Sequence, residues 1–139
     1  MIKTIDLTSG EVANLYQYLS AAVTPRPIAF VSTIDSKGNK NLSPFSFFNV
    51  FSINPPILVF SPVRRVRNNT SKHTLDNLYQ VKECVISLVT EEIVQQVSLS
   101  SCDFDAEINE FEKAGFTEVK SDLVEPARVK ESPINFECK

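Results

Sequence analysis

Hydrophobic positions follow a helical period at the start of the chain and a strand period soon after it. An amphipathic helix is predicted over residues 11–21, because apolar side chains recur there every three or four positions. Its apolar face consists of Val12, Leu15, Tyr16 and Leu19. Residues 28–34 are apolar on both alternating faces, which predicts a buried strand. The polar segment 35–40 contains Gly38 and predicts a hairpin turn to an antiparallel partner.

Three more strands are predicted in the middle of the chain. A phenylalanine-rich segment predicts a strand over about residues 46–50, and the following Asn54-Pro55-Pro56 ends it. Residues 57–60 and 84–89 are apolar runs of strand length. Between these two runs a helix is predicted to begin near Thr74, because its hydroxyl can cap the first turn.

Two helices are predicted in the second half of the chain. Thr90 is expected to cap a helix over residues 91–99, which has acidic residues in its first turn. Asp105 is expected to cap another helix over residues 106–114, and Gly115 is expected to end it.

The predicted strands come close together in the sequence and few helices separate them. Leu123-Val124 and residues 134–136 suggest the two last strands. This order indicates a mainly β domain with helical decorations, of the antiparallel β-barrel class, rather than a doubly wound parallel sheet. Because the chain has 139 residues, we expect one domain over residues 1–139.

Composition is that of a globular protein, with 42% hydrophobic and 22% charged residues. The apolar runs are far shorter than the roughly 20 residues that cross a bilayer, so no membrane association is expected. The N-terminus lacks a basic region followed by an apolar block, so we expect a cytoplasmic protein. Cys84, Cys102 and Cys138 have neither disulfide-framework nor zinc spacing, and Cys84 is expected to be a buried, inert thiol.

Positive charge is concentrated in one loop of a chain that is net negative. Residues 61–75 contain Arg64, Arg65, Arg67 and Lys72 and no acid. The loop leads into the helix expected near Thr74, where a cation, a hydroxyl and the helix dipole could meet a phosphate. A solvated loop with a good helix cap is the competing interpretation. Nucleic acid is not expected as a partner, because four cations on an acidic protein supply little counterion release.

The three glycines cannot form a GxGxxG or GxxxxGK loop, so neither standard nucleotide-binding motif is present. Residues 41–46 (NLSPFS) are interpreted as a small-residue turn facing the basic loop, which would suit a flat ligand with a phosphate tail. No Ser/His/Asp set, acid/base carboxylate pair or metal spacing is evident, so no catalytic residue is predicted.

Several motifs together resemble the flavin reductase-like family of FMN-binding split barrels. They are residues 24–33 (TPRPIAFVST), 41–49 (NLSPFSFFN), 55–56 (PP), 60–62 (FSP), 72–74 (KHT) with Asn77, 110–116 (EFEKAGF) and 126–133 (PARVKESP). The resemblance covers nearly the whole chain. It implies an antiparallel split β-barrel that forms a homodimer with FMN in a groove near the dimer interface. A flavin enzyme needs no acid/base set of its own, because the cofactor accepts the hydride.

The resemblance also implies which residues bind FMN. Backbone and hydroxyl groups of residues 41–46 would contact the edge of the isoalloxazine ring, Ser32 and Thr33 would lie beneath the ring, and the loop at Ser61 would lie beside the ribityl chain. The phosphate would be held by Arg67, Lys72 and Thr74, helped by Arg64 and His73. The full implied set is Ser32, Thr33, Asn41, Leu42, Ser43, Pro44, Ser46, Ser61, Pro62, Arg64, Arg67, Lys72, His73 and Thr74.

The residues and the resemblance are consistent with three functions. The leading prediction is an oxidoreductase that passes hydride or electrons from NAD(P)H through FMN to an acceptor. The second is an FMN-binding electron carrier or binding module without NAD(P)H activity of its own, and the third is an interaction domain of this fold without a cofactor. Family members usually continue past the position of Lys139, so we expect a barrel that is incomplete at its C-terminus, with an open strand edge. For that reason FMN binding is the firmer expectation, and turnover with NAD(P)H the weaker one.

Overall fold

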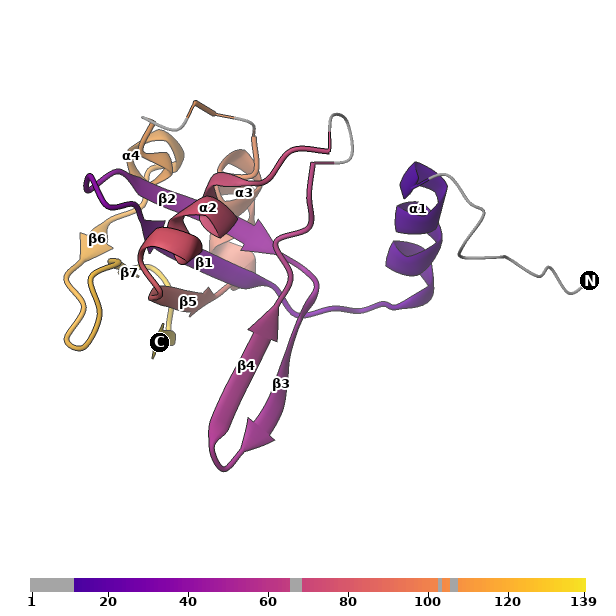
Figure 1. The fold of residues 1–139 in the computed structure, drawn as a ribbon, viewed down its shortest axis with the longest axis horizontal. Helices are drawn as coiled ribbons and strands as arrows, with labels where there is room; N and C mark the ends of the chain where they lie inside the picture. The colour runs from indigo at the N-terminus through magenta and orange to yellow at the C-terminus, as the bar shows by residue number, and fades with distance from the viewer. Residues whose placement is uncertain (1–11, 66–68, 103, 106–107) are drawn as a thin grey trace, which may run out of the picture.

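The computed structural model describes residues 12–65, 69–102, 104–105 and 108–139. Mainly antiparallel strands and a few short helices make up this part of the chain (Figure 1). In order, the elements are α1 (Val12–Ala22), β1 (Ala29–Ile34), β2 (Lys40–Phe45), β3 (Phe48–Ile53), β4 (Pro56–Phe60), α2 (His73–Gln80), β5 (Cys84–Leu88), the 3-10 turn η1 (Glu91–Ile93), α3 (Val94–Leu99), α4 (Glu110–Ala114), β6 (Glu118–Val119), β7 (Arg128–Val129) and β8 (Asn135–Cys138).

The centre of the molecule is an antiparallel sheet in the order β2-β1-β5-β8. β1 and β2 form a hairpin, in which Ala29 lies opposite Phe45 and Thr33 lies opposite Asn41. The hairpin turn has Gly38 at φ 92°, and the Asp35 carboxylate accepts the Asn39 N–H at 2.8 Å. The predicted turn over residues 35–40 is therefore confirmed.

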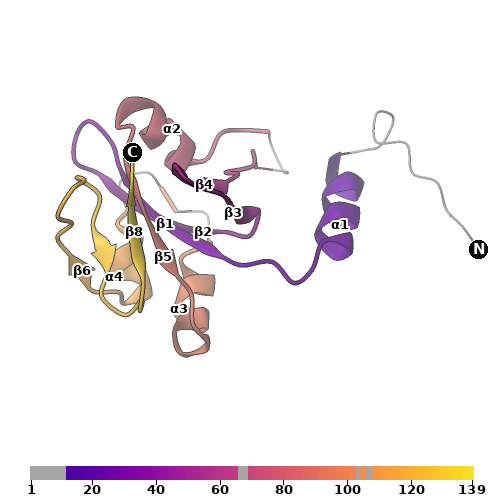
Figure 2. The ribbon, with the colours of Figure 1, turned by 90° about the horizontal axis from the view of Figure 1, so that it is seen from below.

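Each face of this sheet has its own hydrophobic cluster, because successive side chains of a strand point to opposite faces. Phe30 and Leu42 pack with residues of α3 and α4 on one face. Val31 and Phe45 pack on the other face, with half-buried residues of α2 and of the β3–β4 hairpin. Figure 2 shows α2 and α3 on opposite sides of the sheet.

The β3–β4 hairpin and α1 extend from this body (Figure 1). The hairpin carries exposed apolar side chains such as Phe51 and Ile53. α1 approaches the start of the hairpin, where the Tyr16 and Phe47 rings have centroids 6.1 Å apart. Arg26 holds the end of α1, because its guanidinium donates to the Ser20 carbonyl at 2.6 Å.

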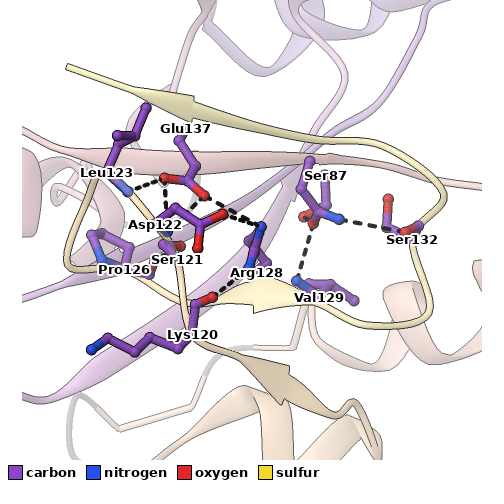
Figure 3. A network of polar contacts seen from close by, with 11 residues as sticks. Ser87, Lys120, Ser121, Asp122, Leu123, Pro126, Arg128, Val129, Ser132 and Glu137 are labelled. Carbon is purple, nitrogen blue, oxygen red and sulfur yellow. Dashed lines mark hydrogen bonds and ion pairs between the residues drawn. The ribbon is translucent and has the colours of Figure 1, made fainter.

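A carboxylate of the edge strand β8 forms hydrogen bonds with the loop between β6 and β7. Glu137 accepts the backbone N–H of Asp122 at 3.0 Å and that of Leu123, and it lies 3.7 Å from the Arg128 guanidinium (Figure 3). These backbone hydrogen bonds hold the pKa of Glu137 below its ordinary value. Through these contacts the Glu137 side chain connects β8 to the loop before β7 and to Arg128 of β7.

Most predicted elements are confirmed. The structure has the first helix, the strands at residues 28–34, 57–60 and 84–89, the helical segment after Thr90 and the last strand. Glu11, the first residue of the predicted helix, lies outside the described residues. Gly115 ends α4 in the left-handed conformation, with φ 73°, as expected.

Other predictions are wrong in position. Residues 41–46 are not a turn: β2 begins directly after the Gly38 turn, and the predicted strand at 46–50 begins instead at Phe48. The alternation of Asn41, Leu42 and Ser43 suits a strand with one face buried against α3 and α4. Pairing with β1 therefore decides the conformation, although the Ser43-Pro44 sequence suggested a turn.

Two predicted caps and one predicted strand are also corrected. Lys72 is the N-cap of α2, and the Thr74 hydroxyl bonds to another element. Asn109 caps α4, because its side chain accepts the Phe111 N–H at 3.1 Å; part of the helix predicted at 106–114 lies outside the described residues. Residues 123–124 lie in a bend between β6 and β7. None of the helices in the described part of the chain has the length and apolar character needed to cross a bilayer.

Candidate functional site

A small polar pocket opens at the start of α2. β2, the loop after β4, the segment after α3 and the first residue of α4 surround it. Its lining consists of Asn41, Ser43, Arg65, Lys72, His73, Thr74, Ser101, Cys102, Phe104 and Glu110. Five residues of the predicted set therefore meet in one place: Asn41, Ser43, Lys72, His73 and Thr74.

The first turn of α2 supplies hydrogen-bond donors to this pocket. The Lys72 carbonyl accepts the Leu75 N–H at 3.0 Å, which is the first hydrogen bond of the helix. The N–H groups of His73 and Thr74 precede that bond, so the helix itself provides no acceptor for them. Together with the helix dipole, such groups attract an anion.

A buried chain of hydrogen bonds forms the back of the pocket. Thr74 Oγ1 donates to Asn41 Oδ1 at 2.6 Å, and Asn41 Nδ2 donates to Glu110 Oε1 at 2.8 Å. Glu110 Oε2 accepts the Leu42 N–H at 3.1 Å. The exposed fractions of Thr74, Asn41 and Glu110 are only 1%, 6% and 4%. The Thr74 hydroxyl proton is used in this chain, so Thr74 offers a ligand its backbone N–H.

The same chain of bonds defines the orientation of the Asn41 amide. Its oxygen faces the Thr74 hydroxyl and its nitrogen faces the Glu110 carboxylate. A flipped amide would place its donor group against the Thr74 hydroxyl and its oxygen against a carboxylate oxygen. The buried acid therefore links α4 to the wall of the pocket beside α2.

Glu110 brings an acid into a pocket that also has cations. Burial raises the pKa of Glu110, and the hydrogen bonds from Leu42 and Asn41 offset only part of this effect. Arg65 and Lys72 line the same pocket. Arg65 and Lys72 are half-buried, whereas Glu110 is buried and hydrogen-bonded to β2.

One cation of the pocket also contacts an aromatic ring of the core. The Lys72 ammonium is 5.0 Å from the centroid of the Phe45 ring, within the range of a cation–π contact. Phe45 in turn packs against Phe60 of β4, with ring centroids 5.4 Å apart. The polar pocket and the start of the β3–β4 hairpin are thus joined through Phe45.

The basic loop folds back on itself. Arg64 Nε donates to both the carbonyl and the side-chain oxygen of Asn69 at 2.8 Å, and Arg65 donates to the Ser71 carbonyl. Asn69 has a positive φ of 54°, which asparagine tolerates better than most residues. Arg65, rather than the predicted Arg64, lines the pocket. Arg67 lies outside the described residues.

The hydroxyl residues near the hairpin form a second group. Arg26 Nε lies 3.4 Å from Ser46 Oγ, and its guanidinium is 5.5 Å from the centroid of the Phe47 ring. Ser61 N donates to the Phe47 carbonyl at 2.9 Å, and Pro62 follows it. Ser46, Ser61 and Pro62 therefore lie at the start of the hairpin and outside the pocket lining.

Strand alternation divides the remaining predicted residues. Ser32 and Thr33 are buried neighbours on β1, so their side chains point to opposite faces of the sheet. Thr33 accepts a hydrogen bond from Asn77 of α2 at 3.1 Å, and Ser32 lies opposite Leu42. The two side chains therefore lie on opposite faces of the sheet, and only the Thr33 side chain is on the α2 face.

The same alternation acts on β2. Asn41 and Ser43 face α2 and the pocket, whereas the Leu42 side chain is in the core beneath α3 and α4. Pro44 lies opposite Phe30, on the Leu42 side. The Leu42 side chain cannot reach a ligand in the pocket, and its N–H is used by Glu110.

Comparison with known proteins identifies the family. Residues 21–139 match the family described as flavin reductase like domain. The chain belongs to this flavin reductase-like family. It is 44% identical over 132 residues to a protein of Aquifex aeolicus and 43% identical over 124 residues to one of Halalkalibacterium halodurans. These alignments cover 95% and 89% of this chain but 66% and 59% of the relatives, so the chain spans about two thirds or less of their length.

Solved structures share the fold of this flavin reductase-like domain. Nitrilotriacetate monooxygenase component B from Bacillus cereus is 28% identical with a TM-score of 0.91, covering 99% of this chain and 67% of that protein. Pseudomonas fluorescens 2-nitrobenzoate 2-nitroreductase is 30% identical with a TM-score of 0.82, covering 99% and 64%. A Shewanella frigidimarina protein described as a flavin reductase with a split barrel domain is 25% identical with a TM-score of 0.78, covering 94% and 63%. The predicted split-barrel fold class is confirmed.

Sequence reasoning missed three contributors to the site of this flavin reductase-like domain. Glu110 was noted within the EFEKAGF motif, but no role followed from it, because only the fold brings α4 against β2. Arg65 was one of several basic residues in the loop, and the sequence offered no signal to separate it from Arg64. Phe45 has the strand spacing of a core residue, so the sequence indicated no contact with a ligand site. Its contact with Lys72 depends on the path of the loop between β4 and α2.

Proposed function

We propose that this flavin reductase-like domain binds FMN and passes hydride or electrons from NAD(P)H through FMN to an acceptor. The observation that carries the proposal is the donor set at the start of α2. Lys72 and Arg65 supply positive charge, His73 and Thr74 supply backbone N–H groups, and Ser43 supplies a hydroxyl in one pocket.

The chemistry of this donor set fits a phosphate monoester. Such a group carries up to two negative charges and has three acceptor oxygens, so it can use two cations and several N–H donors at once. Glu110 does not oppose this fit strongly, because its oxygens accept hydrogen bonds from Asn41 and Leu42. In the proposed complex Lys72, His73 and Thr74 hold the phosphate, with Arg65 added to the set.

The start of the β3–β4 hairpin suits the other end of the same ligand. Phe45 connects it to the pocket, and Ser46 and Ser61 lie there with Pro62. These residues would orient the ring and the ribityl chain and exclude water from one side. FMN supplies the hydride and electron chemistry when bound, so the protein needs to position it rather than to provide a general base.

The homodimer also belongs to this proposal. The β3–β4 hairpin and α1 expose large apolar side chains, including Tyr16, Leu19, Phe51 and Ile53. Exposed apolar surface of this kind is typical of an interaction site. We propose that a second copy covers part of it.

The test is a fluorescence titration of the chain with FMN. Reversing one pocket charge with Lys72→Glu is expected to weaken FMN binding about 100-fold, because a phosphate cation becomes a repelling acid. Lys37→Glu makes the same charge change on the exposed β1–β2 turn and should alter the affinity less than about twofold. An equal loss of FMN affinity in both variants, or no FMN binding by the unaltered chain, would contradict the proposal.

A second measurement separates the two flavin-dependent functions. NADH or NADPH added to the FMN complex under argon is expected to bleach the flavin absorbance and to be consumed in proportion. Flavin that binds but is reduced by dithionite alone would favour the electron-carrier function instead.

A further inference from the structure

Two cysteines that are far apart in the sequence face each other in the central sheet. Cys84 of β5 lies directly opposite Cys138 of β8. Opposed residues of antiparallel strands have Cα atoms about 4.5–5.5 Å apart, and a disulfide bridges Cα distances of about 4.4–6.8 Å. Both side chains belong to the cluster on the α2 face, and both line an open apolar groove of about 860 Å³. Their positions therefore satisfy the first requirement for a disulfide.

The two thiols differ in access to a reagent. Cys84 is buried, with 6% of its surface exposed, whereas Cys138 is half-buried near the end of β8. The side-chain contact with Cys138 and, secondly, burial raise the pKa of Cys84. The same contact lowers the pKa of Cys138. Cys138 is thus the thiol that an oxidant reaches first, and Cys84 is placed to react with its oxidised form.

We propose that Cys84 and Cys138 form a redox-active dithiol, which a peroxide converts into a disulfide between β5 and β8. The Cys138 thiolate attacks hydrogen peroxide, the O–O bond breaks, and a sulfenic acid and hydroxide form. The Cys84 sulfur then attacks the sulfenic sulfur, the S–O bond breaks, and the thiol proton leaves with the hydroxyl group as water. Two thiols are oxidised and one peroxide is reduced to two waters.

The disulfide would join the edge strand β8 covalently to its neighbour β5. β8 is the last strand of the four-stranded sheet, and it pairs with β5 on one side. It also forms part of the wall of the apolar groove, together with the β3–β4 hairpin. The disulfide would hold the end of β8 and restrict changes in the width of this groove. The inference is independent of the proposed flavin chemistry.

The experiment treats the reduced full chain with one equivalent of hydrogen peroxide and then alkylates it under denaturing conditions. The expected product has a mass lower by about 2 Da before alkylation and one alkylatable thiol, Cys102, where the reduced chain has three. Peptide mapping should find Cys84 linked to Cys138, and dithiothreitol should restore all three thiols. The oxidised chain should also melt at a higher temperature than the reduced chain.

Single variants make the result decisive. Cys102→Ser should still form the internal disulfide, because Cys102 lines the polar pocket and not the groove that holds the pair. Cys138→Ser changes a half-buried residue and should abolish the linkage without unfolding the protein, which circular dichroism checks. Sulfinic acid at Cys138, or dimers joined through Cys102, with Cys84 still alkylatable would overturn the proposal.

Discussion

Within the described part of the chain, the polar pocket at α2 and the apolar groove beside β8 are built in opposite ways. The pocket at α2 has polar walls, and its buried groups Thr74, Asn41 and Glu110 satisfy one another's hydrogen bonds. The groove between the β3–β4 hairpin and β8 has apolar walls, which end in side chains as exposed as Ile53 at 88%. The pocket is therefore organised by contacts within the described chain, whereas the groove presents apolar surface for further contacts.

The largest expected change in stability comes from the buried hydrogen bonds behind the polar pocket. Glu110→Ala removes the acceptor of the Asn41 amide and the Leu42 N–H, so two buried donors lose their partner. We expect the free energy of unfolding to fall by about 3 kcal/mol. Chemical denaturation measures it.

Glu112→Ala is the matched control for this variant. It removes the same side chain from the same helix, but Glu112 is exposed. Its effect should be below about 0.5 kcal/mol. If both variants lose equal stability, the loss of an acid from the first turn of α4, rather than the buried network, explains the effect.

A smaller effect concerns the charge of the same group. The pKa of Glu110 is raised above its ordinary value of 4.5, so just above pH 4.5 the folded chain binds more protons than the unfolded chain. Stability from this group is therefore full below pH 4.5 and declines as pH rises through the raised pKa. Compared with Glu110→Gln, which does not titrate, the wild-type chain should lose stability over that window. A constant difference between the two chains across the window would show that burial does not control this carboxyl.

The smallest expected change in stability comes from a substitution in the lining of the apolar groove. Ile53→Ser changes a side chain that already contacts water, so the free energy of unfolding should change by less than about 0.5 kcal/mol. The same variant should weaken self-association in sedimentation experiments, because a homodimer would bury this surface. A large loss of stability at concentrations where the chain is monomeric would show that the hairpin tip is part of the core instead.

Individual residues show how far the sequence could be interpreted. The pattern at 28–34 predicted β1, because a continuous β-branched and aromatic run has few alternatives to a buried strand. The Ser43-Pro44 sequence favoured the prediction of a turn over residues 41–46, which is wrong. These residues form most of β2, because pairing with β1 outweighs the local turn propensity. Asn41 and Ser43 were assigned to the ring edge and Lys72, His73 and Thr74 to the phosphate, but the fold brings all five into the lining of one pocket.

By itself, the sequence determined the family, the mainly antiparallel strand order and the basic loop before α2, because these depend on local patterns and on motif spacing. Only the tertiary structure decided the roles of side chains. It turned Ser32 away from Thr33, placed Glu110 behind Asn41 and set Cys84 opposite Cys138. These relations join distant segments, and strand register and helix packing control them rather than any local sequence preference.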